Sequence, residues 1–88
     1  MKVGFTPKGW EHFQYWLDHD SAMVSRIRML IRDTTRSPFQ GIGKPEPLKN
    51  ELRGWWSRRI DAEHRLVYRV TGFGDDQRLE IAQCRHHY

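Results

Sequence analysis

Apolar residues in the first part of the chain recur at intervals of three and four, which is the period of an α-helix with one buried face. Thr6 followed by Pro7 is typical of a helix start, with threonine as the N-cap and proline in the first turn. The residues expected on the buried face of this first helix are Trp10, Phe13, Trp16 and Leu17. A second helix is expected from about Ser21, with a buried face of Val24, Ile27, Leu30 and Ile31. The short connection between them predicts a helical hairpin.

The helical period stops at residues 37–47, a stretch rich in proline and glycine that predicts a turn-rich loop. Beyond it, residues 55–60, 64–70 and 79–88 are rich in aromatic and β-branched side chains and are separated by turn residues, which is typical of strands. These three strands are expected to form an antiparallel meander. Residues 2–6 can form a further short strand.

The middle strand has alternating faces, because successive side chains of a strand point to opposite sides. Leu66, Tyr68 and Val70 share one face and are expected to cover the helices. Arg65, Val67 and Arg69 share the other face. The pattern therefore predicts an α+β fold in which two helices pack against a mainly antiparallel sheet.

The chain length of 88 residues suits a single domain spanning 1–88. No apolar run approaches the roughly 20 residues of a membrane span, and the N-terminus lacks the pattern of a signal peptide, so a cytoplasmic protein is expected. Cys84 is the single cysteine, which excludes an internal disulfide and fits a reducing compartment.

Fifteen lysines and arginines against eleven acidic residues give a formal charge of +4, which favours an anionic partner such as nucleic acid, although many small basic domains are only well solvated. Cys84, His86 and His87 suggest a metal site, but adjacent residues of a strand point apart, so neither a metal nor another cofactor is expected. The sequence also lacks a glycine-rich phosphate loop with the Walker spacing.

Four segments carry a resemblance to a known family: residues 43–49 (GKPEPLK), 54–60 (GWWSRRI), 63–68 (EHRLVY) and 84–88 (CRHHY). In order and spacing they resemble the YoeB branch of the RelE/ParE toxin superfamily, and the likeness extends over nearly the whole chain. The resemblance implies two N-terminal helices packed on a curved, mainly antiparallel sheet. It also implies a toxin of a type II toxin-antitoxin system, an endoribonuclease that cuts messenger RNA in the ribosomal A site and so inhibits translation.

The resemblance assigns roles to individual residues of this chain. The catalytic groups fall on Glu46 as general base, Arg65 as stabiliser of negative charge and His87 as general acid. Residues expected to line the same site and hold RNA are Lys49, Arg59, Glu63 and Tyr88. His86 stands where the family often has an aromatic residue, so the choice between two neighbouring imidazoles as the acid stays open.

These residue types suit RNA cleavage without a metal. The reaction needs a base for the 2′-hydroxyl proton, an acid for the leaving 5′-oxygen and cations for the developing phosphorane charge. Histidine titrates near neutrality, and the planar guanidinium of arginine can donate two hydrogen bonds to a phosphate. A tyrosine at residue 88 could stack on an unpaired base.

The resemblance also implies partners: an antitoxin of the YefM type, the 70S ribosome with its messenger RNA, and a second copy of the chain in a homodimer. Two other functions remain open on the same fold. One is a non-catalytic toxin of the ParE type that acts on DNA gyrase, and the other is a passive RNA-binding module. The set of Glu46, Arg65 and His87 distinguishes the enzyme, because neither alternative requires it.

Overall fold

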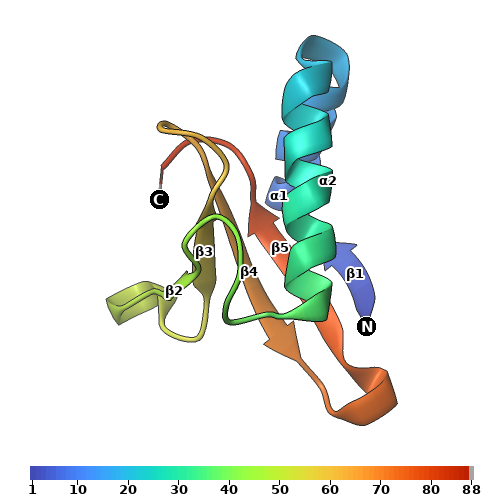
Figure 1. Ribbon diagram of the computed structural model, residues 1–88, viewed down its shortest axis with the longest axis vertical. Coiled ribbons are helices and arrows are strands. Elements are labelled where there is room, and N and C mark those ends of the chain that lie inside the picture. Colours follow the sequence, from blue (N-terminus) through green and yellow to red (C-terminus); the bar gives the residue numbers. More distant parts are fainter. Residues whose placement is uncertain (88) are drawn as a thin grey trace.

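In the computed structural model, which describes residues 1–87, two helices pack on one face of a five-stranded sheet (Figure 1). The helices are α1 (Pro7–His19) and α2 (Ser21–Arg36), and the strands are β1 (Lys2–Phe5), β2 (Glu46–Pro47), β3 (Trp56–Arg59), β4 (Arg65–Thr71) and β5 (Arg78–Gln83). Short 3-10 turns, η1 (Asn50–Leu52) and η2 (Gly74–Asp76), interrupt the loops. The strand order is β1-β5-β4-β3-β2, with β1 parallel to β5 and all other pairs antiparallel. The predicted α+β, mainly antiparallel fold is confirmed.

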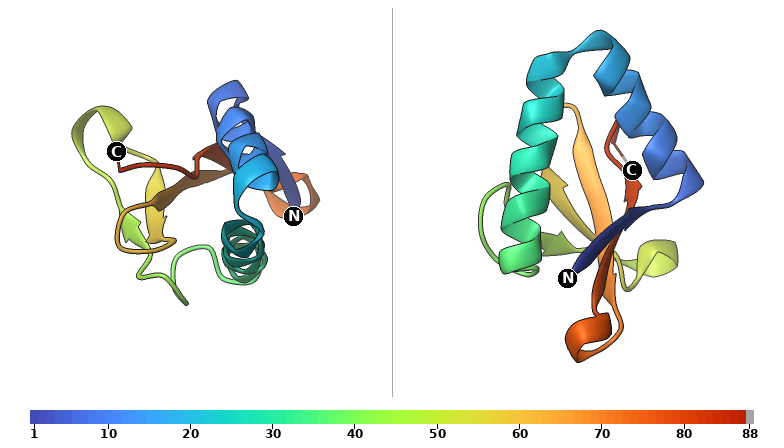
Figure 2. Two further views of the ribbon diagram at one scale, coloured as in Figure 1. Left: turned by 90° about the horizontal axis from the view of Figure 1, so that it is seen from above. Right: turned by 90° about the vertical axis from the view of Figure 1, so that its right-hand side faces the viewer.

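Side-chain caps define the helical hairpin. The hydroxyl of Thr6 accepts a hydrogen bond from the backbone N–H of Gly9 at 3.1 Å, as expected for an N-cap. Asp20 ends α1 and caps α2, where its carboxylate accepts from the N–H groups of Ala22 and Met23 at 3.1 and 3.2 Å. One residue therefore separates the two helices, and the predicted hairpin is confirmed (Figure 2).

The buried face of α1 differs from the predicted one. Trp16 is buried as expected and Phe13 is partly buried, but Trp10 and Leu17 are 46% and 52% exposed, so their assignment to the core was wrong. The buried residues of α1 are Gly9, His12 and Trp16. A side chain at position 9 would collide with the backbone carbonyl of Ile81, so this glycine lets α1 lie directly on β5 and turns its small face toward the sheet.

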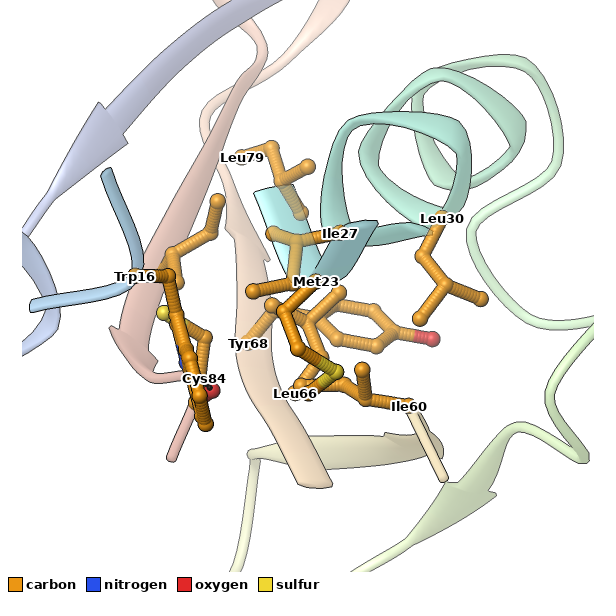
Figure 3. Packing of buried hydrophobic residues seen from close by; sticks show 10 residues of the cluster. Trp16, Met23, Ile27, Leu30, Ile60, Leu66, Tyr68, Leu79 and Cys84 are labelled. Atoms are coloured by element: carbon orange, nitrogen blue, oxygen red, sulfur yellow. Dashed lines mark hydrogen bonds between the residues drawn. The ribbon is translucent and has the colours of Figure 1, made fainter. Parts of the chain in front are cut away.

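The hydrophobic core lies between the helices and the sheet (Figure 3). Its buried residues include Met23, Ile27 and Leu30 of α2, Leu66 and Tyr68 of β4, and Leu79 and Ile81 of β5. The partly buried Val70 packs against this cluster, which confirms the predicted face of β4. Val24 and Ile31, predicted as core residues, are half-buried at its margin.

Two elements of the sheet differ from the sequence prediction. The last strand ends at Gln83 rather than at the C-terminus, so residues 84–87 lie outside the sheet. Glu46, expected in a loop, lies in the two-residue strand β2, where it pairs with Ser57 of β3. Both differences concern segments with few β-branched residues, whose conformation is set by tertiary contacts rather than by local propensity.

A buried arginine holds the loop that follows α2. Arg58 is fully buried, and its guanidinium donates to the Asp33 carboxylate at 2.7 Å and to the Tyr68 hydroxyl at 3.2 Å. It also donates to three loop carbonyls, those of Ser37, Gln40 and Ile42, at 2.5–3.1 Å. Every hydrogen-bonding edge of the guanidinium is thus used, which is the condition under which a buried charge is tolerated.

Removal of the partner carboxylate is expected to destabilise the fold strongly. Asp33→Ala leaves the Arg58 charge buried without its counter-ion, which typically costs about 3–5 kcal/mol, here nearer 3 because the Asp33 side chain is 14% exposed. Urea denaturation measures this loss, with the exposed Asp18→Ala as the control. Equal unfolding free energies for the two variants would contradict the proposed contribution of this ion pair to stability.

Acid should act on the same pair. The hydrogen bond from Arg58, with further bonds from the Ile42 N–H and from Arg36, holds the pKa of Asp33 below its usual value. A depressed folded-state pKa gives stability that is complete above about pH 4, the ordinary range of an aspartate, and is lost as pH falls through the lower value. Urea midpoints measured from pH 5 to pH 2 should therefore fall more steeply for the wild type than for Asp33→Ala, and parallel curves would contradict this account.

Candidate functional site

Strand register assigns the side chains of β3 and β4 to the two faces of the sheet. Leu66 and Tyr68 point into the core, so Arg65 and Val67 point to the face away from the helices. Directly opposed residues of antiparallel strands share a face. The partner of Arg65 is Arg59 on β3, and both arginines therefore lie on the face away from the helices.

The same register places Glu46 beside these arginines. Ser57 opposes Val67 on one side and Glu46 on the other, so the three residues form one row across β4, β3 and β2. The next row consists of Arg59 and Arg65. A carboxylate and two guanidinium groups thus occupy adjacent rows on one face of the sheet.

The guanidinium of Arg65 is anchored at one nitrogen. Its Nη1 donates to the backbone carbonyls of Asp61 at 2.8 Å and His64 at 3.1 Å, in the turn that precedes β4. Within residues 1–87, its Nε and Nη2 make no hydrogen bond. The side chain is therefore oriented by the turn and keeps donors available for an anion such as phosphate.

Three further charged side chains are exposed near this face. Glu46, Lys49 and Arg59 form no side-chain hydrogen bond or ion pair with any residue in the described part of the chain. An open pocket of about 680 Å³ is lined by residues 46–52, and so borders both Glu46 and Lys49. The carboxylate of Glu46 is thus accessible to a ligand and is not neutralised by a fixed partner.

Glu63, predicted to line the site, lies in the turn between β3 and β4. Its carboxylate is exposed and lies 3.9 Å from Nε2 of His64. The backbone N–H groups of Glu63 and His64 donate to the Asp61 carboxylate at 2.9 and 2.7 Å. Burial alone would raise the pKa of Asp61, but these two hydrogen bonds outweigh it and the pKa is lowered, so the ionised carboxylate fixes the turn.

After Gln83 the chain leaves the sheet, and side chains of α1 form hydrogen bonds with its backbone groups. The indole N–H of Trp16 donates to the Cys84 carbonyl at 2.9 Å, and the Cys84 N–H donates to Nδ1 of His12 at 3.2 Å. Burial lowers the pKa of His12, and the nearby charge of Lys8 lowers it further. A lowered pKa favours the neutral ring, whose Nδ1 can accept the hydrogen bond from the Cys84 N–H. The start of the C-terminal segment is therefore fixed to α1.

The next residues of this segment lie against β4. The N–H of His86 donates to Nδ1 of His64 at 2.7 Å, and the N–H of Arg65 donates to the His86 carbonyl at 3.1 Å. His86 has a φ of 68°, in the left-handed region that non-glycine residues rarely adopt. These contacts bring His87, the following residue, to the Arg65 end of β4, and Figure 2 shows the C-terminal segment turning toward the β2–η1 side of the sheet.

Because this segment is not a strand, the expectation that His86 and His87 point to opposite faces of a sheet was wrong. The ring of His86 instead lies between His12 and His64, with ring centroids 5.9 and 6.0 Å away. In the described part of the chain no three His, Cys, Asp or Glu residues lie close enough to hold a metal ion. Tyr88, the last predicted site residue, lies outside residues 1–87.

Sequence reasoning missed the residues that support this site: Arg58, Asp61, His12 and His64. Only His12 left a usable signal, since it precedes Trp16 by four residues and thus shares its face of α1. The other three are charged or polar residues in strands and turns, where exposure is the ordinary expectation.

Comparison with known proteins identifies the family. The model of the YoeB-like toxins of bacterial type II toxin-antitoxin systems matches residues 5–88. The chain belongs to this family. It is 53% identical over the full length of both chains to the toxin YoeB of Streptomyces coelicolor. The YoeB-like toxins act as ribosome-dependent messenger RNA endoribonucleases.

Solved structures agree with this assignment. A YoeB/ParE toxin from Agrobacterium tumefaciens is 55% identical, with a TM-score of 0.96 and complete coverage of both chains. The YoeB dimer from Staphylococcus aureus is 42% identical, with a TM-score of 0.86, and the match covers 100% of this chain and 98% of that one. Within residues 1–87 no helix has the length and apolar character that a membrane crossing requires.

The buried Cys84 provides a test of the C-terminal segment. Burial raises the pKa of its thiol to about 12, so at pH 8 only about one thiol in ten thousand is ionised. Alkylation by iodoacetamide should be at least about 100-fold slower in the native protein than in urea, because the thiolate is the nucleophile. Mass spectrometry follows the modification, and similar rates in both states would show that the segment is not held as described.

Proposed function

We propose that this toxin cleaves messenger RNA in the ribosomal A site by metal-independent acid–base catalysis. Glu46 acts as the general base, Arg65 stabilises the negative charge and His87 is the general acid. The observation that carries the proposal is the strand register, which sets the accessible Glu46 carboxylate one row from Arg59 and Arg65 on the same face. Hydrogen bonds between β4 and His86 bring the C-terminal segment to that row.

Each group has a defined step. Glu46 takes the proton of the 2′-hydroxyl, and the 2′-oxygen attacks the adjacent phosphorus. The bond from phosphorus to the 5′-oxygen breaks, and His87 donates a proton to that oxygen. The products are a 2′,3′-cyclic phosphate and a 5′-hydroxyl. Arg65 donates its available N–H groups to the non-bridging oxygens, whose charge increases as the phosphorane forms.

The remaining predicted residues hold the RNA on either side of the scissile bond. Lys49 and Arg59 have exposed cationic groups without partners in the described part of the chain, which suits them to contact neighbouring phosphates. Glu63 lies beside His64, with its exposed carboxylate 3.9 Å from Nε2, and is proposed to line the same site. Tyr88 is proposed to stack on an unpaired base.

His87 is preferred to His86 as the acid because of the contacts of the two residues. The His86 ring packs between two other imidazoles on the α1 side, and both of its backbone groups are hydrogen-bonded. A ring held there is poorly placed to donate a proton to a leaving 5′-oxygen beside Arg65. His87 directly follows the residue whose carbonyl accepts from the Arg65 N–H, so its imidazole is the one proposed to reach the phosphate.

In this proposal the ribosome orients the RNA strand, which the small protein cannot do alone. The pocket next to Glu46 is open, so a flexible RNA strand would gain little orientation from the toxin alone. A messenger held in the decoding site is already oriented, and correct orientation can contribute several orders of magnitude in rate. We therefore place the reaction in the cytoplasm, on translating ribosomes.

The basic face formed by Arg59 and Arg65 also suits an inhibitory partner with an acidic segment. A YoeB–YefM complex from Staphylococcus aureus is a heterotetramer, and its toxin is 43% identical to this chain. We propose a YefM-type antitoxin whose acidic segment covers the Arg59 and Arg65 face, and a toxin that can also form the homodimer seen for the Staphylococcus protein.

Single-turnover cleavage of a defined messenger on purified ribosomes tests the three roles. Glu46→Gln, Arg65→Lys and His87→Gln should each lower the rate about 100-fold or more, because each removes a group that acts in the transition state. The exposed Asp75→Asn and Arg78→Lys variants serve as controls and should cut at the wild-type rate. Primer extension locates and quantifies the cut.

Full activity of Glu46→Gln or His87→Gln would contradict the acid–base assignment. Ribosome binding without any cleavage by the wild type would instead favour a passive RNA-binding protein, and inhibition of DNA supercoiling would favour the gyrase-directed alternative.

Sulfur substitution tests metal independence without removing the magnesium that ribosomes need. Sulfur in place of a non-bridging oxygen binds Mg²⁺ poorly but accepts softer metals. If no metal contacts the phosphate, Mn²⁺ should restore no activity on either diastereomer of the modified messenger. Restoration by Mn²⁺ for one diastereomer would show that a metal ion takes part.

A further inference from the structure

We propose that His64 is a positioning residue for the cleavage reaction, whose Nδ1 accepts the backbone N–H of His86 and thereby holds the imidazole of His87 at the scissile phosphate. This inference rests on the proposed role of His87 as the general acid. It adds a residue that does not itself touch the RNA.

His64 is fixed from three sides and is only 9% exposed. Its ring meets the indole of Trp16 edge-on, with centroids 4.9 Å apart and an interplanar angle of 81°. Its backbone N–H donates to the Asp61 carboxylate at 2.7 Å, and its carbonyl accepts from Nη1 of Arg65 at 3.1 Å. The ring is therefore a rigid support joined to the same turn that orients Arg65.

The hydrogen bond to His86 defines the tautomer of this ring. A backbone N–H can only donate, so Nδ1 at 2.7 Å must offer its lone pair and carry no proton. The proton of the neutral ring then lies on Nε2, which faces the Glu63 carboxylate at 3.9 Å. Because 3.9 Å exceeds hydrogen-bond distance, the contact with His86 is the one that defines the tautomer.

The C-terminal segment depends on this contact because it has left the sheet. Apart from the bond from the Arg65 N–H to the carbonyl, the His64 ring makes the only backbone hydrogen bond to His86 within residues 1–87. His86 also keeps a left-handed backbone, which persists only where surrounding contacts enforce it. Loss of the acceptor should therefore release this conformation and displace the next residue, His87.

Two substitutions of His64 by amides of similar size distinguish the position of the hydrogen-bond acceptor from the bulk of the side chain. In His64→Asn the amide oxygen can take the place of Nδ1, whereas in His64→Gln it reaches the place of Nε2. We expect His64→Asn to keep kcat within about five-fold of the wild type. His64→Gln should lower kcat about 100-fold with little change in KM, because a misplacement of about 1 Å has an effect of this size.

A double-mutant cycle with His87→Ala shows whether His64 acts through His87. If it does, His64→Gln should lower the rate no further once His87 is absent. Activity is normalised to folded protein by circular dichroism. Equal losses for His64→Asn and His64→Gln, or a full additional loss in the His87→Ala background, would overturn the positioning role.

The outcomes separate this inference from the proposed function. Full activity of His87→Ala would refute the acid role itself. A large loss in His87→Ala together with an unimpaired His64→Gln would refute only the inference about His64.

The wild-type protein supplies a measurement that does not depend on any variant folding. Nitrogen NMR of the His64 ring should show an unprotonated Nδ1 with a coupling through the hydrogen bond to the His86 amide. A protonated Nδ1 in the folded wild type would overturn the proposal.

Discussion

The position of the candidate site depends on the buried guanidinium of Arg58. The loop from residue 37 to 43 has no regular structure, and three of its carbonyls accept hydrogen bonds from this side chain. The same group binds Asp33 of α2 and Tyr68 of β4, and thus joins helix, loop and sheet. The loop then ends at Gly43, whose carbonyl accepts from the Arg59 N–H at 2.7 Å and brings the chain into register with β3. Glu46 reaches the sheet because the loop before it is fixed.

On the C-terminal side of the site, side chains likewise hold an irregular segment through hydrogen bonds to its backbone. Two imidazoles, one indole and a strand N–H form hydrogen bonds with the backbone groups of Cys84 and His86, where a sheet neighbour is lacking. The two ends of the proposed site therefore differ, because Glu46 lies on the two-residue strand β2 and His87 on the irregular segment after β5. The pair β3–β4 lies between them with Arg59 and Arg65. This division suits a site that needs fixed cations and two proton-transfer groups that approach a bound strand from opposite sides.

Local signals were enough to predict the helices, the core face of β4 and the fold class, because periodicity and caps act within a few residues. They were insufficient for the face of α1, where Gly9 against Ile81 overrides the larger Trp10, and for the end of β5 at Gln83. The candidate catalytic residues came from resemblance to a family and not from chemistry in the sequence. Their supports, Arg58 and His64, act through contacts of ten or more residues in separation, which no local pattern encodes.

The most direct test of the central claim is a structure of this toxin on a programmed ribosome whose messenger carries a 2′-O-methyl group at the cut site. We predict that the Glu46 carboxylate lies about 3 Å from the 2′-oxygen and the His87 imidazole about 3 Å from the leaving 5′-oxygen, with Arg65 on the phosphate between them. A scissile phosphate bound away from the face formed by Arg59 and Arg65, or a magnesium ion in place of these side chains, would contradict the account.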